Sequence, residues 1–530
     1  MAAPISRRDL RGAPLSTIAA ELGGADAAVT IVGDGSTRVR DVQQDSRKIT
    51  GGELFVARAG SADEAQVARF TLDAIARGAA AVMRARERPR VPLSVPCLEL
   101  PEHRLRAALG MAASTVLGHP SYVVEVLAIT GTNGKTTTSF LLADALDRLA
   151  RARGEGVDCA VIGTVGARLG DEERATTHTT PEGDELARLI AWARDEGARH
   201  VALEASSHAL EQGRLAGTRI RAAAFTNLTQ DHLDYHLTME RYFEAKRRLF
   251  VELHPGVSAI WIDDPYGARL ADEVETPRLR VGTSSNADVR IVRSTCDRSG
   301  IHAELSTPSG AITLDSKLIG AHNLANLTLA LAVMIGLGIP AVDAAAALAE
   351  ARAAPGRLQL VSDPARDDVT VLVDYAHTPD ALSRILAAVR PLSTSRLICV
   401  FGCGGDRDQK KRAPMGRAVV LGADVGIVTS DNPRTEDPVA IVADILVGAS
   451  GEERLDEAAL AHAKKGVHVE IDREKAIERA IRSAVAGDVI VVAGKGHEDY
   501  QIIGNDKRPF DDVKEAQRAL VDRRARAGGG

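Results

Sequence analysis

Short apolar runs that end abruptly in polar residues recur along this chain from its middle onward. Such runs, rich in valine, alanine and isoleucine, predict buried strands. The polar residues that follow them predict a functional edge of a sheet. In the central part, the runs at 201–203, 222–225 and 260–262 are followed by Glu204, by Thr226 and Asn227, and by Asp263 and Asp264.

The last third of the chain repeats this pattern in runs at 369–373, 397–400, 425–428 and 489–492. Most of these runs precede a segment with helical periodicity, such as 380–389 or 437–447. Strands that alternate with helices predict parallel sheets. Because ligands bind at the carboxyl ends of parallel strands, we expect the polar clusters to gather there.

Three blocks emerge from the pattern, and a length of 530 residues fits about three domains. The first block, 1–120, ends at the His119-Pro120 step, because proline interrupts regular structure. The second covers 121–354 and the third 355–530. The sequence therefore predicts an α/β protein of three domains. Within the first block we expect strands at 39–42 and 54–57 and a helix at 72–78.

A small-residue loop, Gly131-Thr132-Asn133-Gly134-Lys135-Thr136-Thr137, connects an apolar strand at 123–130 to a helical pattern. Glycines let backbone N–H groups point at phosphate oxygens, Lys135 adds a charge, and Thr136 can ligate Mg²⁺. Ile129 stands where the general P-loop has its first glycine, so this is a shorter and rarer loop. It predicts that the chain binds a nucleoside triphosphate.

Composition narrows the class of protein. The net charge is −6 and there is no block of lysine and arginine, which argues against nucleic acid as a partner. Five cysteines without a C-x-x-C pair suit reduced thiols in a cytoplasm rather than disulfides or a zinc site. The N-terminus has no apolar segment after its arginines, so we expect no signal peptide, and no run approaches the apolar length of a membrane helix. We expect a cytoplasmic protein, without membrane insertion, that works as a monomer.

Two polar clusters in the central block are candidates for chemistry. Glu204 at a strand end suits a Mg²⁺ ligand or a residue that positions water, although it could also be a solvated strand terminus. The segment 226–236 packs two acids and two histidines into its last six residues, and it could equally be a polar loop with a capping aspartate. Lys246, taken alone, is an ordinary helix lysine.

Three loops of the last block suit a zwitterionic ligand. They span 401–408, 430–437 and 494–499, and each combines glycine or proline turns with arginine, lysine or carboxylate side chains. Guanidinium groups bind carboxylates, and carboxylates bind ammonium groups. The alternative is that two or more of these loops are only turns.

With these motifs in order, the chain resembles the Mur ligases of peptidoglycan synthesis over nearly its whole length. The resemblance implies a mixed α/β N-terminal domain for the UDP-sugar, a central P-loop ATPase sheet, and a C-terminal Rossmann-like domain for an amino acid. The motifs that carry it are TGTNGKTT, HTTP, EASSHAL, TNLTQDHLDYH, PGR, DYAHTPD, FGCGGDRD, DNPRTEDP and GKGHEDYQ.

The resemblance also implies the reaction. An ADP-forming acid–amino-acid ligase would add meso-diaminopimelate to UDP-N-acetylmuramoyl-L-alanyl-D-glutamate, using ATP and Mg²⁺. ATP would phosphorylate the D-glutamyl side-chain carboxylate, and the amino group of diaminopimelate would attack the acyl phosphate. Lys135, His232 and Lys246 would be catalytic, and Lys246 would be carbamylated, which turns its ammonium into a metal-binding group.

The remaining site residues follow from the same motifs. ATP would be held by Gly131, Thr132, Asn133, Gly134, Lys135, Thr136, Thr137, Asn323, Arg357 and Asp374, with His377 nearby. The UDP-muramoyl-dipeptide would be held by Gln44, Ser46, His178, Thr179, Thr180, Ser206, Gln212 and Arg214. The metal would be held by Thr136, Glu204, His232 and carbamylated Lys246. Diaminopimelate would be held by Arg407, Asp431, Asn432, Pro433, Arg434, Gly494 and Glu498.

Three positions depart from the family pattern, and several rival functions remain. Trp261 and Gln359 replace an asparagine and a glutamate, and the loop at 60–65 lacks the usual Asp-Gly-His. The nearest rivals are a sibling ligase for lysine or another amino acid and folylpolyglutamate synthase, which shares the nucleotide loop. A phosphotransferase, a P-loop motor and a catalytically silent scaffold are rivals of other classes.

Overall fold

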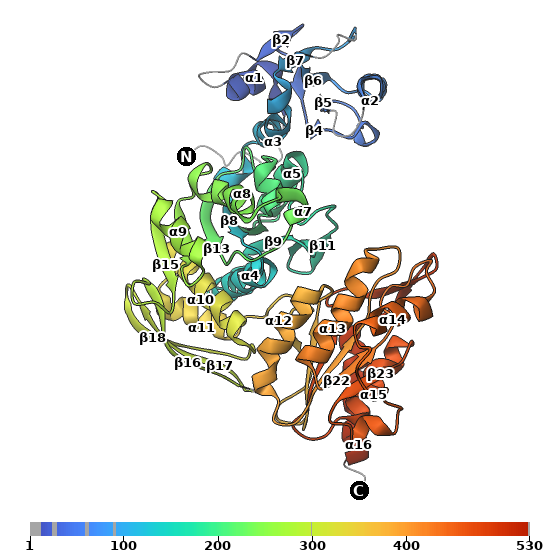
Figure 1. Ribbon diagram of the computed structural model, residues 1–530. Coiled ribbons are helices and arrows are strands. Elements are labelled where there is room, and N and C mark those ends of the chain that lie inside the picture. Colours follow the sequence, from blue (N-terminus) through green and yellow to red (C-terminus); the bar gives the residue numbers. More distant parts are fainter. Residues whose placement is uncertain (1–11, 24–28, 59–62, 88–91, 298, 528–530) are drawn as a thin grey trace. The chain divides into compact units, whose positions relative to one another are not determined.

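The structure is a computed structural model that describes residues 12–23, 29–58, 63–87, 92–297 and 299–527 (Figure 1). Contacts within the chain divide it into two compact units. Unit 1 comprises Met1–Ile291, Leu305–Ile312 and Ala325–Leu348, and unit 2 comprises Val292–Glu304, Thr313–Leu324 and Ala349–Gly530. Each unit contains its own apolar clusters.

The N-terminal part of unit 1 is a five-stranded sheet. Its order is β2 (Thr30–Val32), β7 (Cys97–Leu100), β6 (Ala81–Ala85), β5 (Leu54–Ala57) and β4 (Val42–Gln43). Strands β4 to β7 are parallel, and β2 is antiparallel to β7. Side chains of α1 (Leu15–Gly23) and α3 (Leu105–Val116) cover one face, and those of α2 (Glu64–Ala76) cover the other. Both faces are therefore buried, as the apolar strands require.

Two expectations for this part were wrong. The run at 39–42 is not one strand, because the chain bends at Arg40. As a result β3 (Arg38–Val39) pairs with β1 (Ala13–Pro14) in a separate sheet, while β4 joins the five-stranded one. The helix expected at 72–78 is α2, which begins at Glu64 because Asp63 and Gln66 form a capping box, and which ends at Ala76.

The central sheet carries the glycine loop. In the spatial order β9-β12-β8-β13-β14-β15-β16, each strand runs parallel to its neighbours, as predicted. Strands β10 and β11 add an antiparallel edge that the sequence did not predict. The order is β11 (Glu172–Arg174), β10 (Gly166–Leu169), β9 (Cys159–Gly163), β12 (His200–Glu204), β8 (Glu125–Thr130), β13 (Ile220–Phe225), β14 (Val257–Trp261), β15 (Arg278–Gly282), β16 (Val289–Asp297), β17 (Gly300–Thr307) and β18 (Gly310–Ser316).

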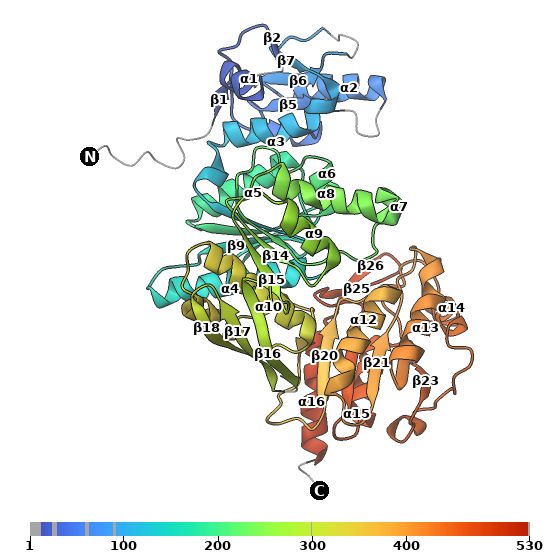
Figure 2. The same cartoon turned by 60° about the vertical axis from the view of Figure 1, so that its left-hand side comes forward.

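Helices connect the strands of the central sheet, and one of them also packs against the N-terminal part. Ala187 and Ala191 of α5 (Gly183–Asp195) join the apolar cluster of the N-terminal sheet, and α5 packs along α3. Figures 1 and 2 both show α3 between that sheet and α5. The other helices are α4 (Lys135–Ala152), α6 (Ser207–Glu211), α7 (Leu233–His236), α8 (Met239–Val251), α9 (Pro265–Glu273), α10 (Ala321–Gly336) and α11 (Ala341–Ala349).

Unit 2 contains a six-stranded sheet with helices on both faces (Figure 2). The order is β19 (Gln359–Leu360), β20 (Thr370–Asp374), β24 (Val489–Ala493), β21 (Leu397–Phe401), β22 (Val425–Val428) and β23 (Gly466–Val469). Only the short β19 is antiparallel to its neighbour among these described strands, so the parallel prediction is confirmed here.

The helices of unit 2 divide between the two faces of its sheet. Apolar side chains of α12 (Pro379–Val389), α13 (Arg412–Gly422) and α14 (Pro438–Val447) cover one face. Those of α15 (Arg473–Ser483) and α16 (Asp512–Ala527) cover the other. A hairpin of β25 (Tyr500–Ile503) and β26 (Asp506–Pro509) follows β24. Within the described ranges, no helix of either unit is long and apolar enough to cross a membrane.

Candidate active site

The glycine loop lies between β8 and α4, as predicted. Gly131 has a φ of +144°, and a Cβ atom there would lie 1.8 Å from the Thr226 hydroxyl oxygen. Gly134 has a φ of +86°, and a Cβ atom there would lie 2.4 Å from Asn326 Oδ1. Lys135 Nζ donates hydrogen bonds to two carbonyl oxygens of the loop, at 2.9 Å each. Both glycines are therefore required, and the loop curls around the lysine in the manner of a phosphate-binding loop.

The polar segment after β13 braces this loop. Thr226 Oγ1 donates to Asn133 O at 2.6 Å, and Thr132 N donates to Asn227 O at 2.9 Å. Thr132 Oγ1 also donates to Thr229 O at 3.1 Å. The first residues of segment 226–236 therefore hold the glycine loop in place, a role that sequence reasoning did not assign to them.

Thr136 and Glu204 lie together, as a magnesium site requires. Thr136 Oγ1 donates to Glu204 Oε2 at 2.9 Å, and Thr164 donates to both carboxylate oxygens, from its N–H at 2.9 Å and from its hydroxyl at 3.1 Å. Glu204 is the last residue of β12 and is fully buried, so it is not a solvated strand terminus. Hydroxyl and carboxylate oxygens are the ligands that Mg²⁺ prefers, and these residues fit that ion.

Lys246 is buried on α8 beneath the glycine loop. Its Nζ donates to Gly131 O at 2.7 Å and lies 4.6 Å from the centroid of the Tyr242 ring. Burial, together with the charge of Lys135, lowers the pKa of Lys246 well below its ordinary value. Among the described residues no carboxylate forms an ion pair with it. Burial therefore shifts Lys246 toward the neutral amine.

His232 lies just before α7 with a left-handed backbone, at a φ of +51°. Burial lowers its pKa, and Lys135 and Lys246 act in the same direction against Asp231. Across the ranges that the structure describes, no three His, Cys, Asp or Glu side chains gather as a metal site. Of the four predicted ligands only Glu204 and His232 are of these types, so the set of Thr136, Glu204, His232 and carbamylated Lys246 stays a prediction.

Several residues predicted for the muramoyl-dipeptide meet at the ends of β12 and α6. Thr180 Oγ1 accepts the Ser206 N–H at 2.9 Å and donates to Glu204 O at 2.7 Å. Thr179 Oγ1 lies 3.4 Å from the Thr164 hydroxyl, beside the same carboxylate. His178 is exposed, and its Nδ1 lies 2.9 Å from the Thr177 hydroxyl. The threonines thus connect the substrate motif directly to Glu204.

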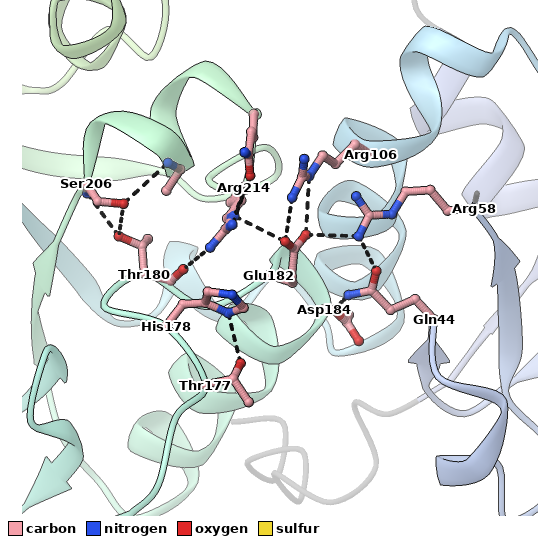
Figure 3. Close-up of polar contacts among 12 residues, drawn as sticks. Gln44, Arg58, Arg106, Thr177, His178, Thr180, Glu182, Asp184, Ser206 and Arg214 are labelled. Atoms are coloured by element: carbon pink, nitrogen blue, oxygen red, sulfur yellow. Dashed lines mark hydrogen bonds and ion pairs between the residues drawn. The ribbon is translucent and has the colours of Figure 1, made fainter. Parts of the chain in front are cut away.

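Arg214 extends this group toward the N-terminal sheet (Figure 3). Its Nη1 donates to Thr180 O at 2.8 Å, and its Nε and Nη2 donate to Gln212 Oε1 at 3.1 and 2.8 Å. Its Nε also lies 3.2 Å from Glu182 Oε1. Arg214, Gln212 and Thr180 therefore lie in one place, as the sequence predicts.

Gln44 and Ser46, the two residues predicted in the N-terminal part, have different neighbours. Gln44 Nε2 donates to Asp184 Oδ1 at 3.3 Å, and its Oε1 accepts from Arg58, so Gln44 belongs to the Arg214 side. Ser46 is buried in a short 3₁₀ turn, and its hydroxyl bonds to Asp73 of α2, which lowers the pKa of Asp73. No contact among the described residues joins Ser46 to the Arg214 side. The loop at 60–65 lies partly outside the described residues.

The other residues predicted for the nucleotide lie in unit 2. Asp374 ends β20 and accepts the Leu358 and Ala376 N–H groups at 2.8 and 2.7 Å. Burial raises the pKa of Asp374, and the charge of Arg357 opposes this. The Arg357 guanidinium lies 4.8 Å from the Tyr375 ring centroid. Three other side chains form local hydrogen bonds. Asn323 Nδ2 donates to Ile319 O at 2.8 Å, and Gln359 Oε1 accepts the Gly356 N–H at 2.9 Å. His377 Nδ1 lies 2.7 Å from Tyr375 O.

The loops predicted for diaminopimelate converge at the carboxyl edge of the unit 2 sheet. Arg434 has a left-handed backbone, at a φ of +51°, and its Nη1 donates to Gly405 O at 2.8 Å. Asn432 Nδ2 donates to Glu498 Oε2 at 2.9 Å. Pro433 lies between these two residues in the sequence, and a Cβ atom on Gly405 would lie 1.9 Å from its carbonyl oxygen. Gly494 has a φ of +121°. Arg407 is exposed in the turn after β21.

Lys495 joins these loops, although sequence reasoning did not select it. It is fully buried, and its Nζ donates to Asn432 Oδ1 at 2.9 Å and to Tyr500 O at 2.8 Å. Asp431 Oδ1 lies 3.3 Å from Nζ and Glu498 Oε2 lies 3.8 Å away. Burial lowers the pKa of Lys495 even though both carboxylates raise it. Arg58, Arg106 and Glu182 were likewise not predicted. The signal for Lys495 and Glu182 was their place inside or directly after a motif.

Comparison with known proteins identifies the family. Residues 129–334 match the Mur ligase middle domain, and residues 356–496 match the Mur ligase glutamate ligase domain. Curated relatives named UDP-N-acetylmuramoyl-L-alanyl-D-glutamate–2,6-diaminopimelate ligase include those of Geobacter metallireducens and Gloeobacter violaceus. The first is 43% identical over 90% of this chain and 93% of its own length, and the second is 41% identical over 92% and 95%.

Solved structures agree with this result. A structure with the same ligase name has a TM-score of 0.70 and is 34% identical over 96% of this chain and 99% of its own. Folylpolyglutamate synthase of Mycobacterium tuberculosis, at 16% identity and a TM-score of 0.55, covers 78% of this chain and 94% of its own, a likeness that shows a similar fold. The family predicted from the motifs is confirmed, and the chain belongs to the Mur ligases.

Proposed function

We propose that this chain is an ATP-dependent, ADP-forming ligase that joins meso-diaminopimelate to UDP-N-acetylmuramoyl-L-alanyl-D-glutamate in peptidoglycan synthesis. The observation that carries the choice of amino acid is the buried network around Lys495, which joins Asn432, Asp431 and Glu498, with Arg434 Nη1 3.5 Å from Asn432 O. A guanidinium group receives a carboxylate, and carboxylates receive an ammonium group. Diaminopimelate has an ammonium group and a carboxylate at each end, so it supplies both kinds of group.

The reaction begins with activation of a carboxylate, which is a poor electrophile. The D-glutamyl side-chain carboxylate attacks the γ-phosphorus of ATP, ADP leaves, and an acyl phosphate forms. The amino group of diaminopimelate then attacks the acyl carbon and phosphate leaves. The glycine loop binds the phosphates of ATP, and Lys135 stabilises the charge that develops on the transferring phosphoryl group. Thr179, Thr180 and Ser206 orient the dipeptide beside Glu204.

Magnesium would be held by Thr136, Glu204, His232 and carbamylated Lys246. When bound, the ion would supply positive charge near the transferring phosphoryl group. Support for the protein part of this site comes from the Thr136–Glu204 hydrogen bond and from the lowered pKa of Lys246. A neutral amine reacts with CO₂, whereas an ammonium does not, so burial prepares Lys246 for carbamylation.

Each of the three predicted domains has its own role in the proposed reaction. Residues 1–120 bind the UDP-sugar, 121–354 bind and cleave ATP, and 355–530 bind diaminopimelate. Asn323, Arg357 and Asp374 contribute to the nucleotide site, and Arg407 contributes to the diaminopimelate site. The free thiols and the small, charged substrates suit a monomer that works in the cytoplasm, without nucleic-acid partners or membrane insertion.

Phosphate release tests the proposal. UDP-N-acetylmuramoyl-L-alanyl-D-glutamate, ATP and Mg²⁺ are supplied together with diaminopimelate, with lysine, or with no amino acid. We expect strong stimulation by diaminopimelate and little by lysine, because lysine leaves Arg434 unpaired. Preferential stimulation by lysine would indicate a sibling ligase. Stimulation by a folate and glutamate instead would indicate folylpolyglutamate synthase, and release under none of these conditions would indicate a silent scaffold.

A further inference from the structure

Three guanidinium groups converge on the single carboxylate of Glu182 (Figure 3). Glu182 directly precedes α5. Arg106, in the first turn of α3, donates from Nη2 to Oε1 at 2.6 Å and from Nε to Oε2 at 3.3 Å. Arg58 Nη2, just after β5, lies 3.4 Å from Oε2, and Arg214 Nε lies 3.2 Å from Oε1. The three arginines come from different elements: Arg58 follows β5, Arg106 lies in α3, and Arg214 lies in the turn between α6 and β13.

Positive charge exceeds negative charge in the cluster. Burial lowers the pKa of Arg58, and the charge of Arg106 lowers it further; burial also lowers the pKa of Arg214. Burial opposes ionisation of Glu182, but the hydrogen bond from Arg106 and the charges of Arg214 and Arg58 outweigh it and lower the pKa of Glu182. One carboxylate thus holds together three cations that repel one another.

Neighbouring acids do not remove this excess. Asp184 lies near Arg58, but its Oδ2 accepts from Arg188 at 2.8 Å, and Arg188 also contacts Asp41 at 3.2 Å. Even when these three residues are included, four arginines face three carboxylates. A partly buried site with an excess of guanidinium groups favours an additional oxyanion.

The cluster also borders the residues predicted for the dipeptide substrate. Arg58 donates to Gln44, and Arg214 bridges Glu182, Gln212 and the Thr180 carbonyl oxygen. An anion bound by the three arginines would therefore lie close to the groups that hold the rest of the substrate. Arg106 forms a bidentate contact with Glu182, and it could form the same contact with a substrate carboxylate or phosphate.

We propose that Arg58 and Arg106, together with Arg214, form an oxyanion-binding site for the nucleotide-sugar dipeptide, and that Glu182 fills this site until the substrate displaces it. The inference rests on the proposed function for the identity of the substrate. The oxyanion is either the diphosphate of UDP or the dipeptide carboxylate that is not phosphorylated. On displacement, the Glu182 side chain leaves the three guanidinium groups and the substrate oxyanion takes over their hydrogen bonds.

Binding measured by calorimetry tests the site without relying on turnover. We expect Arg58→Gln and Arg106→Gln each to weaken the binding of UDP-N-acetylmuramoyl-L-alanyl-D-glutamate by about tenfold to a hundredfold, as for the loss of a charge-assisted hydrogen bond. The KM values for ATP and diaminopimelate should stay within about twofold. Arg188→Gln is the matched control, because Arg188 also links the N-terminal part to α5 but does not contact Glu182 among the described residues. An equal loss in Arg188→Gln would mean that the arginines only hold these parts together, and it would overturn the site.

Glu182→Gln tests the displacement. Removing the competing charge should strengthen binding of the same substrate by about threefold to tenfold and make it more dependent on salt concentration. Weaker binding in Glu182→Gln would show that Glu182 supports the arginines rather than competing with the substrate, and would overturn the displacement. Thermal unfolding of each variant checks that it is folded.

Two further ligands identify the source of the oxyanion. If the arginines bind the diphosphate, Arg106→Gln should weaken the binding of UDP as much as that of the complete substrate. If they bind the carboxylate, UDP binding should be unchanged, and only ligands that carry the dipeptide should lose affinity. Unchanged binding of every ligand in both arginine variants overturns the site alone. Wild-type protein that does not bind the dipeptide substrate at all overturns the proposed function and this site together.

Discussion

Lys246 and Lys495 are both buried, and they differ in what surrounds the ammonium group. Lys246, in unit 1, is 1% exposed and donates to a backbone carbonyl oxygen, with the cation of Lys135 nearby. Lys495, in unit 2, is 0% exposed and lies between Asp431 and Glu498, with Asn432 and a carbonyl oxygen completing its hydrogen bonds. Burial lowers the pKa of both lysines. The charges of Asp431 and Glu498 oppose this effect at Lys495, whereas only the charge of Asp231 opposes it at Lys246.

The difference teaches how one residue type can serve two purposes. A buried lysine without a carboxylate partner favours the neutral amine, which is a nucleophile. Two carboxylates beside a buried lysine oppose the loss of its proton, and the ammonium group in turn fixes the groups around it. Lys246 is therefore suited to the proposed carbamylation, and Lys495 is suited to positioning the loops that are proposed to bind diaminopimelate.

The largest expected effect is that of Lys246→Ala. The variant should lose ligation almost completely while it remains folded, because the proposed metal-binding carbamate is absent. Partial recovery with added short carboxylates would support the role as a metal ligand over a role as a charge. Lys514→Ala, which changes a lysine that is 77% exposed, serves as the control. Full activity of Lys246→Ala would remove this residue from the mechanism, and ¹³C-bicarbonate NMR would detect the carbamate in the wild type.

Lys135→Ala should have the next largest effect. In the proposed mechanism Lys135 stabilises charge on the phosphoryl group, and in the structure its charge lowers the pKa of Lys246. We expect phosphoryl transfer at saturating ATP to slow by roughly a hundredfold or more. Carbamylation of Lys246 should also require a higher pH, because a nearby positive charge has been removed. Unchanged turnover would show that this lysine only supports the loop through its two hydrogen bonds.

Arg434→Ala tests the choice of amino acid on the loop that Lys495 supports. The loss of a charge-assisted hydrogen bond costs about 1.5–3 kcal/mol, so kcat/KM for diaminopimelate should fall by roughly tenfold to a hundredfold. The poor rate with lysine should stay the same or improve, because lysine has no distal carboxylate to pair with Arg434. Equal losses for both amino acids would mean that Arg434 shapes its loop rather than binding that carboxylate.

Lys495→Met should have a smaller effect on the same kinetic constants. Asp431, Asn432 and Glu498 would lose their shared cation and move apart, so KM for diaminopimelate should rise by about tenfold. The KM for ATP should not change, and Lys495→Arg should recover part of the loss. Lys507→Met is the control, because Lys507 contacts the face of Tyr500 at 3.8 Å from the hairpin without joining the network. A loss confined to kcat, with both KM values unchanged, would contradict the positioning role.

Much of this comparison could be predicted from the sequence, but not the part that depends on burial. Apolar runs and their polar ends predicted the parallel strands, and the glycine loop predicted a phosphate-binding site. The motifs also led to Lys246. Lys495 and Glu182 lie inside or directly after a motif, but their roles, like those of Arg58 and Arg106, could not be found in this way, because these roles arise from contacts between elements far apart in the chain. Arg106 and Glu182, for example, are 76 positions apart and meet only because α3 packs along α5.

The smallest expected effect is on stability as a function of pH. Burial lowers the pKa of Lys495 in the folded protein below the value of about 10.4 that lysine has in an unfolded chain. Between the two pKa values the unfolded chain binds more protons, so this residue makes the free energy of unfolding rise with pH in that interval and contributes less stability as pH falls. Lys495→Met lacks this contribution. Urea unfolding should therefore show the wild type gaining stability relative to the variant as pH rises toward about 10.4, the ordinary pKa of lysine.

Lys246→Met, measured without bicarbonate, sharpens the comparison. The pKa of Lys246 lies well below the ordinary value, because burial and the charge of Lys135 lower it and only the charge of Asp231 opposes them. The wild type should therefore begin to gain stability relative to Lys246→Met at a lower pH, and over a wider interval, than it does relative to Lys495→Met. Identical pH profiles for the two variants would mean that the carboxylates around Lys495 do not hold its proton. The contrast between a reactive and a structural lysine would then lose its electrostatic basis.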